Sequence, residues 1–285
     1  MKYLLSVILL LPLMGMAQPS QTANRTLPTE EELAAIGDSI IEEGTRLYMY
    51  ESLSWMAADL LKEHAGESMS RITGSAVMVD EDGSLTQFYC SEDSVLFSCS
   101  LDLNDFSLSW DNTVRPMTKN HHIAVAWRTV MINGILETYG DRIQVAPDGS
   151  LSVDLIWISE DKIRAYLLPR TTLDDVIPFG SDCYVDIDVD GNILDFHQFH
   201  HSYIPINVID EENKQMLQVI HSHTSDNPFF TPTDICISLL YARDFFGMTS
   251  TSILSTAFTP SVIMTFNMEE FTITYQEINS GLDHN

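Results

Sequence analysis

Residues 221–234 read HSHTSDNPFFTPTD and lie between two apolar runs, MLQVI at 216–220 and ICISLLY at 235–241. The first run is short and apolar, which predicts a buried strand that ends at the histidines. Side chains two positions apart in a strand face the same side, with Cα atoms about 6.6 Å apart. His221 and His223 are therefore expected to direct both imidazoles towards one point.

The second half of the stretch predicts the start of a helix. Pro232 follows Thr231, and proline is favoured at the first helical position. Asp234 then lies in the first turn, where its carboxylate can point back towards the strand end. Two imidazoles, one carboxylate and an open fourth position are the arrangement of a catalytic zinc site.

The same residues also have a purely structural interpretation. Thr231 as N-cap and Asp234 three residues later form a capping arrangement that needs no metal, because the acid also favours the positive end of the helix. Histidines at a strand end can be solvated or bonded to loop carbonyls. Both interpretations stay open, and the fixed spacing favours the metal site.

The order of these residues is similar to the motif of the JAMM metalloprotease family, also called the MPN-plus domain. That motif is His, any residue, His, seven residues, Ser or Thr, two residues and Asp, and residues 221–234 match its spacing throughout. The chain departs from it at Thr231, where the family has serine, and at Thr224, where proline is usual. The resemblance covers about residues 170–278 and implies a JAMM-like, cytidine-deaminase-like α/β sandwich there.

The resemblance also implies a function for this part of the chain. It assigns zinc to His221, His223 and Asp234, and it assigns the hydrolysis of amide or isopeptide bonds to the site. Thr231 takes the position of the serine whose hydroxyl steadies the oxyanion. In the family a glutamate on an earlier strand acts as general base and acid, and Asp182 is the best candidate for that role because it lies at the start of the corresponding strand.

Asp182 is a departure, because the strand that it opens contains no glutamate. Its shorter side chain places the carboxylate about one methylene farther from the attacking water, and a misplacement of about 1 Å can cost about 100-fold in rate. Glu160, in a predicted turn, and Glu137, at a predicted helix end, are the fallback candidates. The alternative to an enzyme is a non-catalytic periplasmic or surface module with a JAMM-like fold, with or without bound metal.

Elsewhere the pattern predicts helices and antiparallel strands without a regular alternation, which favours an α+β fold. A capping box at Thr29 and Glu32 opens a helical stretch that continues to about His64, with Gly44 breaking or weakening it. Hairpin signals follow, and a further helix is expected over 117–138. We divide the chain into a helical and β-hairpin region at 29–110 and a C-terminal region at 111–285, with the JAMM-like core at about 170–278.

The amino terminus has the pattern of a secretory signal peptide at residues 1–17. The sequence MKYLLSVILLLPLMGMAQ combines Lys2, an apolar core and small residues at Gly15 and Ala17, so cleavage is expected after Ala17. Residues 18–28 then form a polar, flexible leader. No later segment has about 18 consecutive apolar residues, so no membrane span is expected in the mature chain. The expected location is periplasmic or secreted.

The charge of the chain restricts its partners. The 285 residues include 14 Lys and Arg against 41 Asp and Glu, which gives a formal net charge of −27 at pH 7. Such a surface repels phosphate backbones, so nucleic acid is not an expected partner. The expected location suggests a peptide or a cell-wall fragment as the substrate. No GxSxG elbow and no phosphate-binding loop occurs, so a serine hydrolase or a nucleotide enzyme has no support.

Two further sets of residues were considered as sites. His197, His200 and His201 fall in one expected strand, where solvated or packed histidines are favoured over a second metal site. An oxidising compartment can pair the four cysteines in three ways, and the sequence does not choose among them: Cys90, Cys99, Cys183 and Cys236.

Overall fold

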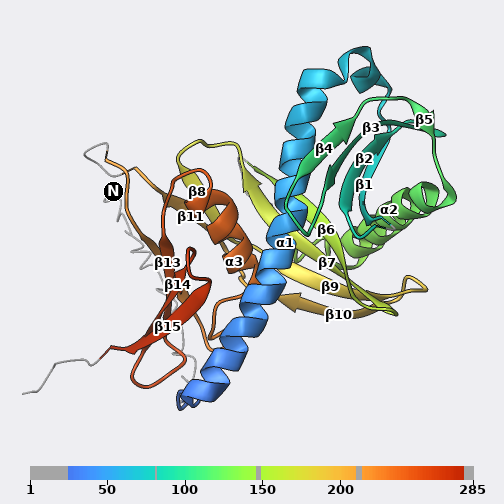
Figure 1. Ribbon diagram of the computed structural model, residues 1–285. Coiled ribbons are helices and arrows are strands. Elements are labelled where there is room, and N and C mark those ends of the chain that lie inside the picture. Colours follow the sequence, from blue (N-terminus) through green and yellow to red (C-terminus); the bar gives the residue numbers. More distant parts are fainter. Residues whose placement is uncertain (1–24, 81, 146–148, 210–213, 279–285) are drawn as a thin grey trace, which may run out of the picture.

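A computed structural model describes residues 25–80, 82–145, 149–209 and 214–278 (Figure 1). The structure is mixed α+β with largely antiparallel sheets, which confirms the predicted α+β class. The signal peptide expected at 1–17, and residues 18–24 of the expected leader, lie outside the described residues. From that leader, Arg25 forms a parallel bridge with Phe258.

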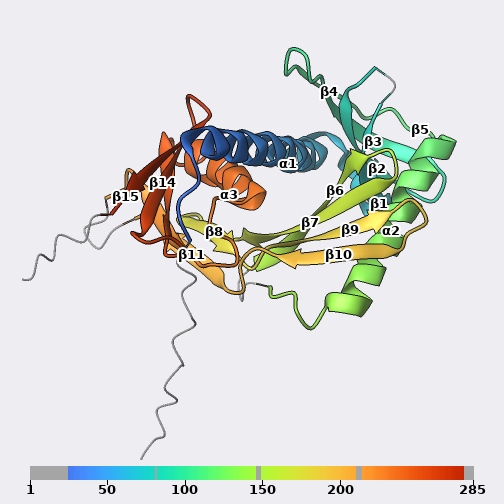
Figure 2. The same cartoon turned by 90° about the horizontal axis from the view of Figure 1, so that it is seen from below.

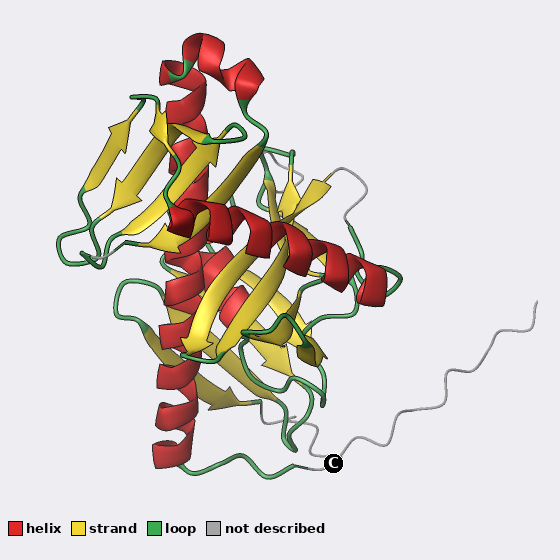
Figure 3. Cartoon of the chain, turned by 90° about the vertical axis from the view of Figure 1, so that its right-hand side faces the viewer, coloured by secondary structure: helices red, strands yellow, loops and turns green. Residues whose placement is uncertain are grey.

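The N-terminal sheet follows the chain in the order β1-β2-β3-β4, with β5 beside β3. Its strands are β1 (Gly74–Val79), β2 (Leu85–Cys90), β3 (Ser94–Leu101), β4 (Leu108–Asp111) and β5 (Arg115–Pro116), preceded by the 3-10 helix η1 (Gly66–Arg71). Helix α2 (Lys119–Tyr139) contacts β1 and lies across the strands in Figure 3. It coincides closely with the helix expected over 117–138.

The middle of the chain forms an antiparallel sheet in the order β10-β9-β7-β6, beside a separate pair of strands, β8 and β11. The bounds are β6 (Gly149–Ser159), β7 (Lys162–Thr171), β8 (Val176–Gly180), β9 (Cys183–Asp188), β10 (Ile193–Gln198) and β11 (Tyr203–Asn207). Between β8 and β9 the chain turns sharply, because Gly180 and Ser181 both have a positive φ, of 79° and 51°. This turn precedes Asp182 directly.

The C-terminal sheet has the order β12-β13-β14-β15, and only its first pair is parallel among the described strands. Its strands are β12 (Val219–His223), β13 (Ser250–Ser255), β14 (Val262–Asn267) and β15 (Thr272–Glu277). Helix α3 (Pro232–Ile237) continues as the π-helical turn η2 (Ser238–Arg243) and connects β12 to β13. A strand, a helix and a parallel strand therefore follow one another around residues 221–234.

Helix α1 (Glu30–His64) is the longest described element and runs beside all of these layers (Figures 1 and 2). It begins at the capping box expected from the sequence, in which Thr29 and Glu32 each bond the backbone N–H of the other. Gly44 does not interrupt it. The helix contacts β2 and β3 of the N-terminal sheet as well as α3 and β15 near the C-terminus. α1 therefore connects parts of the chain that are far apart in sequence.

The main hydrophobic core follows this helix and includes buried residues from Ile41 to Met268. The regional boundary expected between residues 110 and 111 falls inside β4, and this core draws residues from both sides of it. The four cysteines are buried and none forms a disulfide. Among the described helices, none combines the length and the apolar character needed to cross a membrane.

Candidate metal centre

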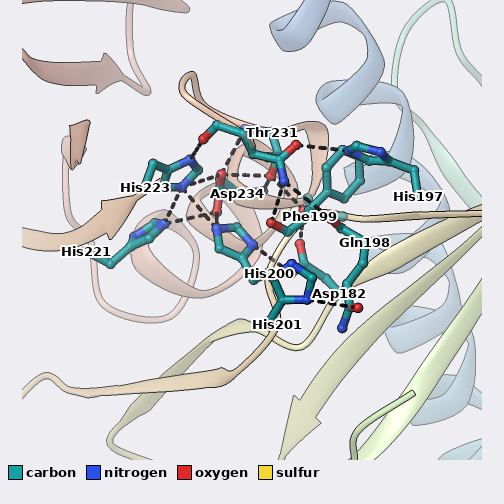
Figure 4. A network of polar contacts seen from close by, with 12 residues as sticks. Asp182, His197, Gln198, Phe199, His200, His201, His221, His223, Thr231 and Asp234 are labelled. Atoms are coloured by element: carbon teal, nitrogen blue, oxygen red, sulfur yellow. Dashed lines mark hydrogen bonds and ion pairs between the residues drawn. The ribbon is translucent and has the colours of Figure 1, made fainter. Parts of the chain in front are cut away.

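Four buried side chains from three segments meet at one point (Figure 4). His221 and His223 lie on β12, whose alternating burial places Ser222 outside and both imidazoles inside. Asp234 lies in the first turn of α3. His200 comes from the loop between β10 and β11. The structure thus brings together the three residues expected to bind metal and adds a third histidine.

The separations of the donor atoms fit a single ion. Nε2 of His223 lies 3.0 Å from Nε2 of both His200 and His221. Oxygens of Asp234 lie 3.2 Å from Nε2 of His221, 3.3 Å from Nε2 of His223 and 3.8 Å from Nε2 of His200. Ligands about 2.0–2.1 Å from a tetrahedral zinc ion are about 3.3 Å from one another. The four residues are therefore close enough to hold a metal ion.

The outer nitrogens of two of the imidazoles fix where their protons lie. Nδ1 of His200 lies 2.7 Å from a carboxylate oxygen of Asp182, and Nδ1 of His223 lies 2.9 Å from the backbone carbonyl of Asn227. Both partners accept, so each Nδ1 donates and each ring directs its Nε2 inwards. The two Nε2 atoms then face each other at 3.0 Å, a separation that needs either a proton or a metal ion between them.

The buried charges of the cluster favour a cation as well. Burial acts to raise the pKa of Asp234, but the three histidines outweigh it and hold that pKa well below its usual range. Burial acts to lower the pKa of His200, but the charges of Asp182 and Asp234 raise it to about 9. The carboxylate of Asp234 thus faces the space between the rings, with that of Asp182 behind His200, and a divalent cation would balance these two buried charges.

Asp234 serves the helix and the cluster at the same time. The backbone N–H and the hydroxyl of Thr231 donate to Oδ2 of Asp234, at 2.8 and 2.7 Å, in a complete capping box. Oδ1 of the same carboxylate faces His221 and His200. Oδ2 also lies 3.3 Å from Nε2 of His223. The capping interpretation and the metal interpretation of the sequence are still compatible, because Oδ1 takes no part in the capping box.

Asp182 stands behind His200 in this arrangement. One of its oxygens accepts from Nδ1 of His200, and the other accepts a short hydrogen bond from the hydroxyl of Thr233. The ring of His200 therefore lies between Asp182 and the ligand atoms. The fallback acids Glu160 and Glu137 are both exposed and belong to other parts of the molecule.

His200 is the residue that sequence reasoning missed. The sequence predicts a single strand through His197, His200 and His201, but β10 ends at Gln198 and β11 begins at Tyr203, so His200 turns inwards from a loop. His197 instead bonds the side chain of Asn227, and His201 is exposed and bonds Gln198. The available signal was the group of three histidines, at 197, 200 and 201, that precedes the pair at 221 and 223.

The cluster has little contact with solvent. The relative exposure of its four residues lies between 1% and 8%. A cavity of about 280 Å³ lies nearby, and its wall includes Asn227 and Thr231, the partners of His223 and Asp234. None of the four ligand residues lines that cavity. The surrounding chain therefore closes the cluster on the side of the cavity.

Three imidazole nitrogens and one carboxylate oxygen suit zinc and neighbouring transition metals better than calcium or magnesium, which prefer oxygen ligands.

Comparisons of the chain with models of protein families, with curated proteins and with solved structures found no match.

Proposed function

We propose that this chain binds one zinc ion through His200, His221, His223 and Asp234, and that the ion stabilises the fold. Zinc sites with four protein ligands are typically structural, whereas catalytic sites keep one position open. The position of His200 carries this proposal. Its Nε2 lies 3.0 Å from Nε2 of His223, so His200 can supply the fourth protein ligand. The protein would then be the non-catalytic module with a bound metal.

The proposed ion would join three segments of the chain. These are the loop between β10 and β11, the end of β12 and the first turn of α3. Asp182 extends the connection to the turn between β8 and β9 through its bond to His200. We expect the ion to contribute most to the stability of the C-terminal part, because the unfolded chain has no preformed site.

The JAMM-like, cytidine-deaminase-like sandwich over about residues 170–278 is part of the same proposal. The parallel pairing of β12 with β13 across α3 supports it, because the histidine pair and the aspartate then lie at one end of a strand–helix–strand unit. The signal-peptide pattern at 1–17 supports a periplasmic or secreted module.

The proposal is tested by metal analysis of the purified mature protein. We expect close to one zinc per chain after incubation with zinc and removal of the excess, and a loss of nearly all of it in His223→Ala. The matched control is His201→Ala, which removes an exposed histidine of the neighbouring loop and should keep the metal. A wild-type protein that takes up no zinc would overturn the proposal.

The second candidate function is a zinc-dependent hydrolase of amide or isopeptide bonds, acting on a peptide or a cell-wall fragment. The observation that favours it is that Thr231, at the position of the oxyanion serine in the resembled motif, lies on the cavity wall. His200 and Asp182 would then act as an acid–base pair, and zinc would supply polarisation of the substrate carbonyl.

The two candidates differ in turnover. The hydrolase predicts cleavage of a peptide or isopeptide substrate by the wild type, reduced by about 100-fold or more in Asp182→Asn while the zinc is retained. The module predicts no cleavage by either protein across the same panel of substrates. Cleavage that requires zinc and depends on Asp182 would replace the structural proposal by the enzymatic one.

Asp182→Asn also has an expected effect on metal affinity. Residues that orient a metal-binding histidine typically contribute about 10–100-fold to affinity, and Asp182 accepts from Nδ1 of His200 at 2.7 Å. We expect competition titration with a chelator to give a zinc dissociation constant about 10–100-fold higher in the variant. Asp195→Asn, an exposed change on β10, is the control and should leave the affinity unaltered. Equal affinities in all three proteins would show that Asp182 does not position His200.

A further inference from the structure

A second polar centre lies far from the histidines, where α2 covers the first two sheets (Figures 1 and 3). Two cavities, of about 450 and 300 Å³, are found there. They share the wall residues Val77, Arg128, Val153 and Asp154, so they adjoin each other, and we refer to them as the two arms of one divided cavity. Their volumes fall at the low end of the range of about 300–1,000 Å³ for small-molecule sites.

The two arms differ in chemistry. The larger arm is lined by polar groups that include Ser75, Gln87 and Arg170. The smaller arm is mostly apolar, with Met78, Ile123, Trp127, Trp157 and Ile163 on its wall. Arg128 lies where the arms meet. A ligand that fills both arms must therefore be polar at one end and apolar at the other.

The charge at the junction is positive. Arg170 donates to Oε2 of Glu51 at 2.7 Å, so these two charges compensate each other. Burial, and then the carboxylate of Glu51, raise the pKa of Asp154 well above its usual range, which keeps the Asp154 carboxyl neutral beside Glu51. Arg128 makes no hydrogen bond or ion pair with any other described residue, although the Asp154 carboxyl lies near enough to act on its charge. The donors of the Arg128 guanidinium are thus left without a direct partner among the described residues.

This charge is unusual for the chain. Acidic residues outnumber basic ones by 41 to 14, yet the wall of the larger arm carries two arginines, Arg128 and Arg170, and one acid, Asp154. Burial lowers the pKa of Arg128 and outweighs the opposite effect of the nearby Asp154. An arginine fork in this setting is suited to a carboxylate, because it can donate two parallel hydrogen bonds to it.

We propose that this divided cavity binds a small amphipathic carboxylate, with its carboxylate on Arg128 and its apolar chain along Trp127 and Trp157. The hydroxyl of Ser75, on the wall of the larger arm, offers a further donor to the carboxylate. The site is independent of the metal centre, because the two share no residue.

Dodecanoate is the probe, and the protein is the full mature chain loaded with zinc. Two of the four tryptophans line the apolar arm, so a bound chain should change the tryptophan fluorescence, and calorimetry should give the same dissociation constant. We expect saturable binding of dodecanoate in the micromolar range. Dodecanol, which has the same chain and no charge, should bind at least about tenfold more weakly, because it cannot form the charge-assisted pair.

Substitutions on the cavity wall test whether the ligand binds there. Arg128→Gln should weaken dodecanoate binding at least about tenfold and change dodecanol binding by less than about twofold, and Arg128→Lys should restore part of the loss. Arg46→Gln is the matched control, because Arg46 pairs with Glu42 on the surface of α1 and should not affect either ligand. Ala124→Trp, which fills the apolar arm, should weaken both ligands.

Three results would overturn the proposal. The first is the lack of saturable dodecanoate binding below about 1 mM. The second is dodecanoate binding that Arg128→Gln and Arg46→Gln reduce equally. The third is binding that survives Ala124→Trp unchanged, which would place the ligand elsewhere. Because Arg128→Lys keeps the charge, its behaviour separates a lost ion pair from a misfolded variant.

Discussion

His223→Ala is expected to lower the free energy of unfolding by about 4 kcal/mol or more when the wild type is saturated with zinc. A ligand that binds only the folded state at about 1,000 times its dissociation constant contributes about 4 kcal/mol. For a chain of this size each kcal/mol changes the midpoint of thermal unfolding by about 2–4 °C. The midpoint should therefore fall by roughly 8–16 °C, measured by circular dichroism in buffered zinc.

The wild type treated with a strong chelator should unfold near the temperature of the variant, because both lack the ion. His201→Ala should keep the stability of the wild type, since His201 is exposed and bonds only Gln198 among the described residues. If the chelator leaves the wild-type midpoint unchanged, the metal has no structural role. If His201→Ala lost as much stability as His223→Ala, the loss would come from disturbing this part of the structure and not from removing a metal ligand.

Gly44→Ala is expected to cost about 3 kcal/mol, although alanine favours helix by about 1 kcal/mol over glycine. A Cβ at Gly44 would lie 2.5 Å from Cβ of Ile235 and 2.7 Å from the carbonyl oxygen of Pro232. Both atoms belong to α3, so α1 and α3 must move apart. Because the first turn of α3 carries Asp234, the variant should also bind zinc more weakly. Urea unfolding and chelator competition measure the two effects.

Gly134→Ala is the matched control for the same exchange in another helix. Gly134 lies in α2, and no neighbouring atom comes within 4 Å of the position of its Cβ. This variant should be as stable as the wild type or more stable by up to about 1 kcal/mol. A Gly44→Ala protein that gains stability in the same way would mean that the two helices are not in close contact.

The part of the site that was predictable from the sequence is local. The alternation of β12 directs His221 and His223 to one side, and the capping pattern fixes Asp234 in the first turn of α3. Each of these relations depends on residues within fourteen positions of one another. The two-residue repeat of a strand and the capping of a helix N-terminus both act over such short distances in sequence. The α+β class followed from the same kind of pattern.

What the sequence did not predict depends on contacts between distant segments. His200 joins the cluster only because the chain bends between β10 and β11 and approaches α3, and no glycine or proline marks that bend. Asp182 was expected beside the metal, and its place behind His200 follows from the same bend. Gly44 was expected to weaken a helix, whereas its lack of a side chain lets α1 approach α3.

X-ray absorption at the zinc edge of the loaded protein tests the four-ligand site most directly. The account predicts four nitrogen or oxygen neighbours of zinc at about 2.0–2.1 Å in the wild type. Scattering from the more distant ring atoms should indicate three imidazole ligands in the wild type and two in His200→Ala. A wild-type spectrum with only two imidazoles, or a spectrum that His200→Ala leaves unchanged, would contradict it.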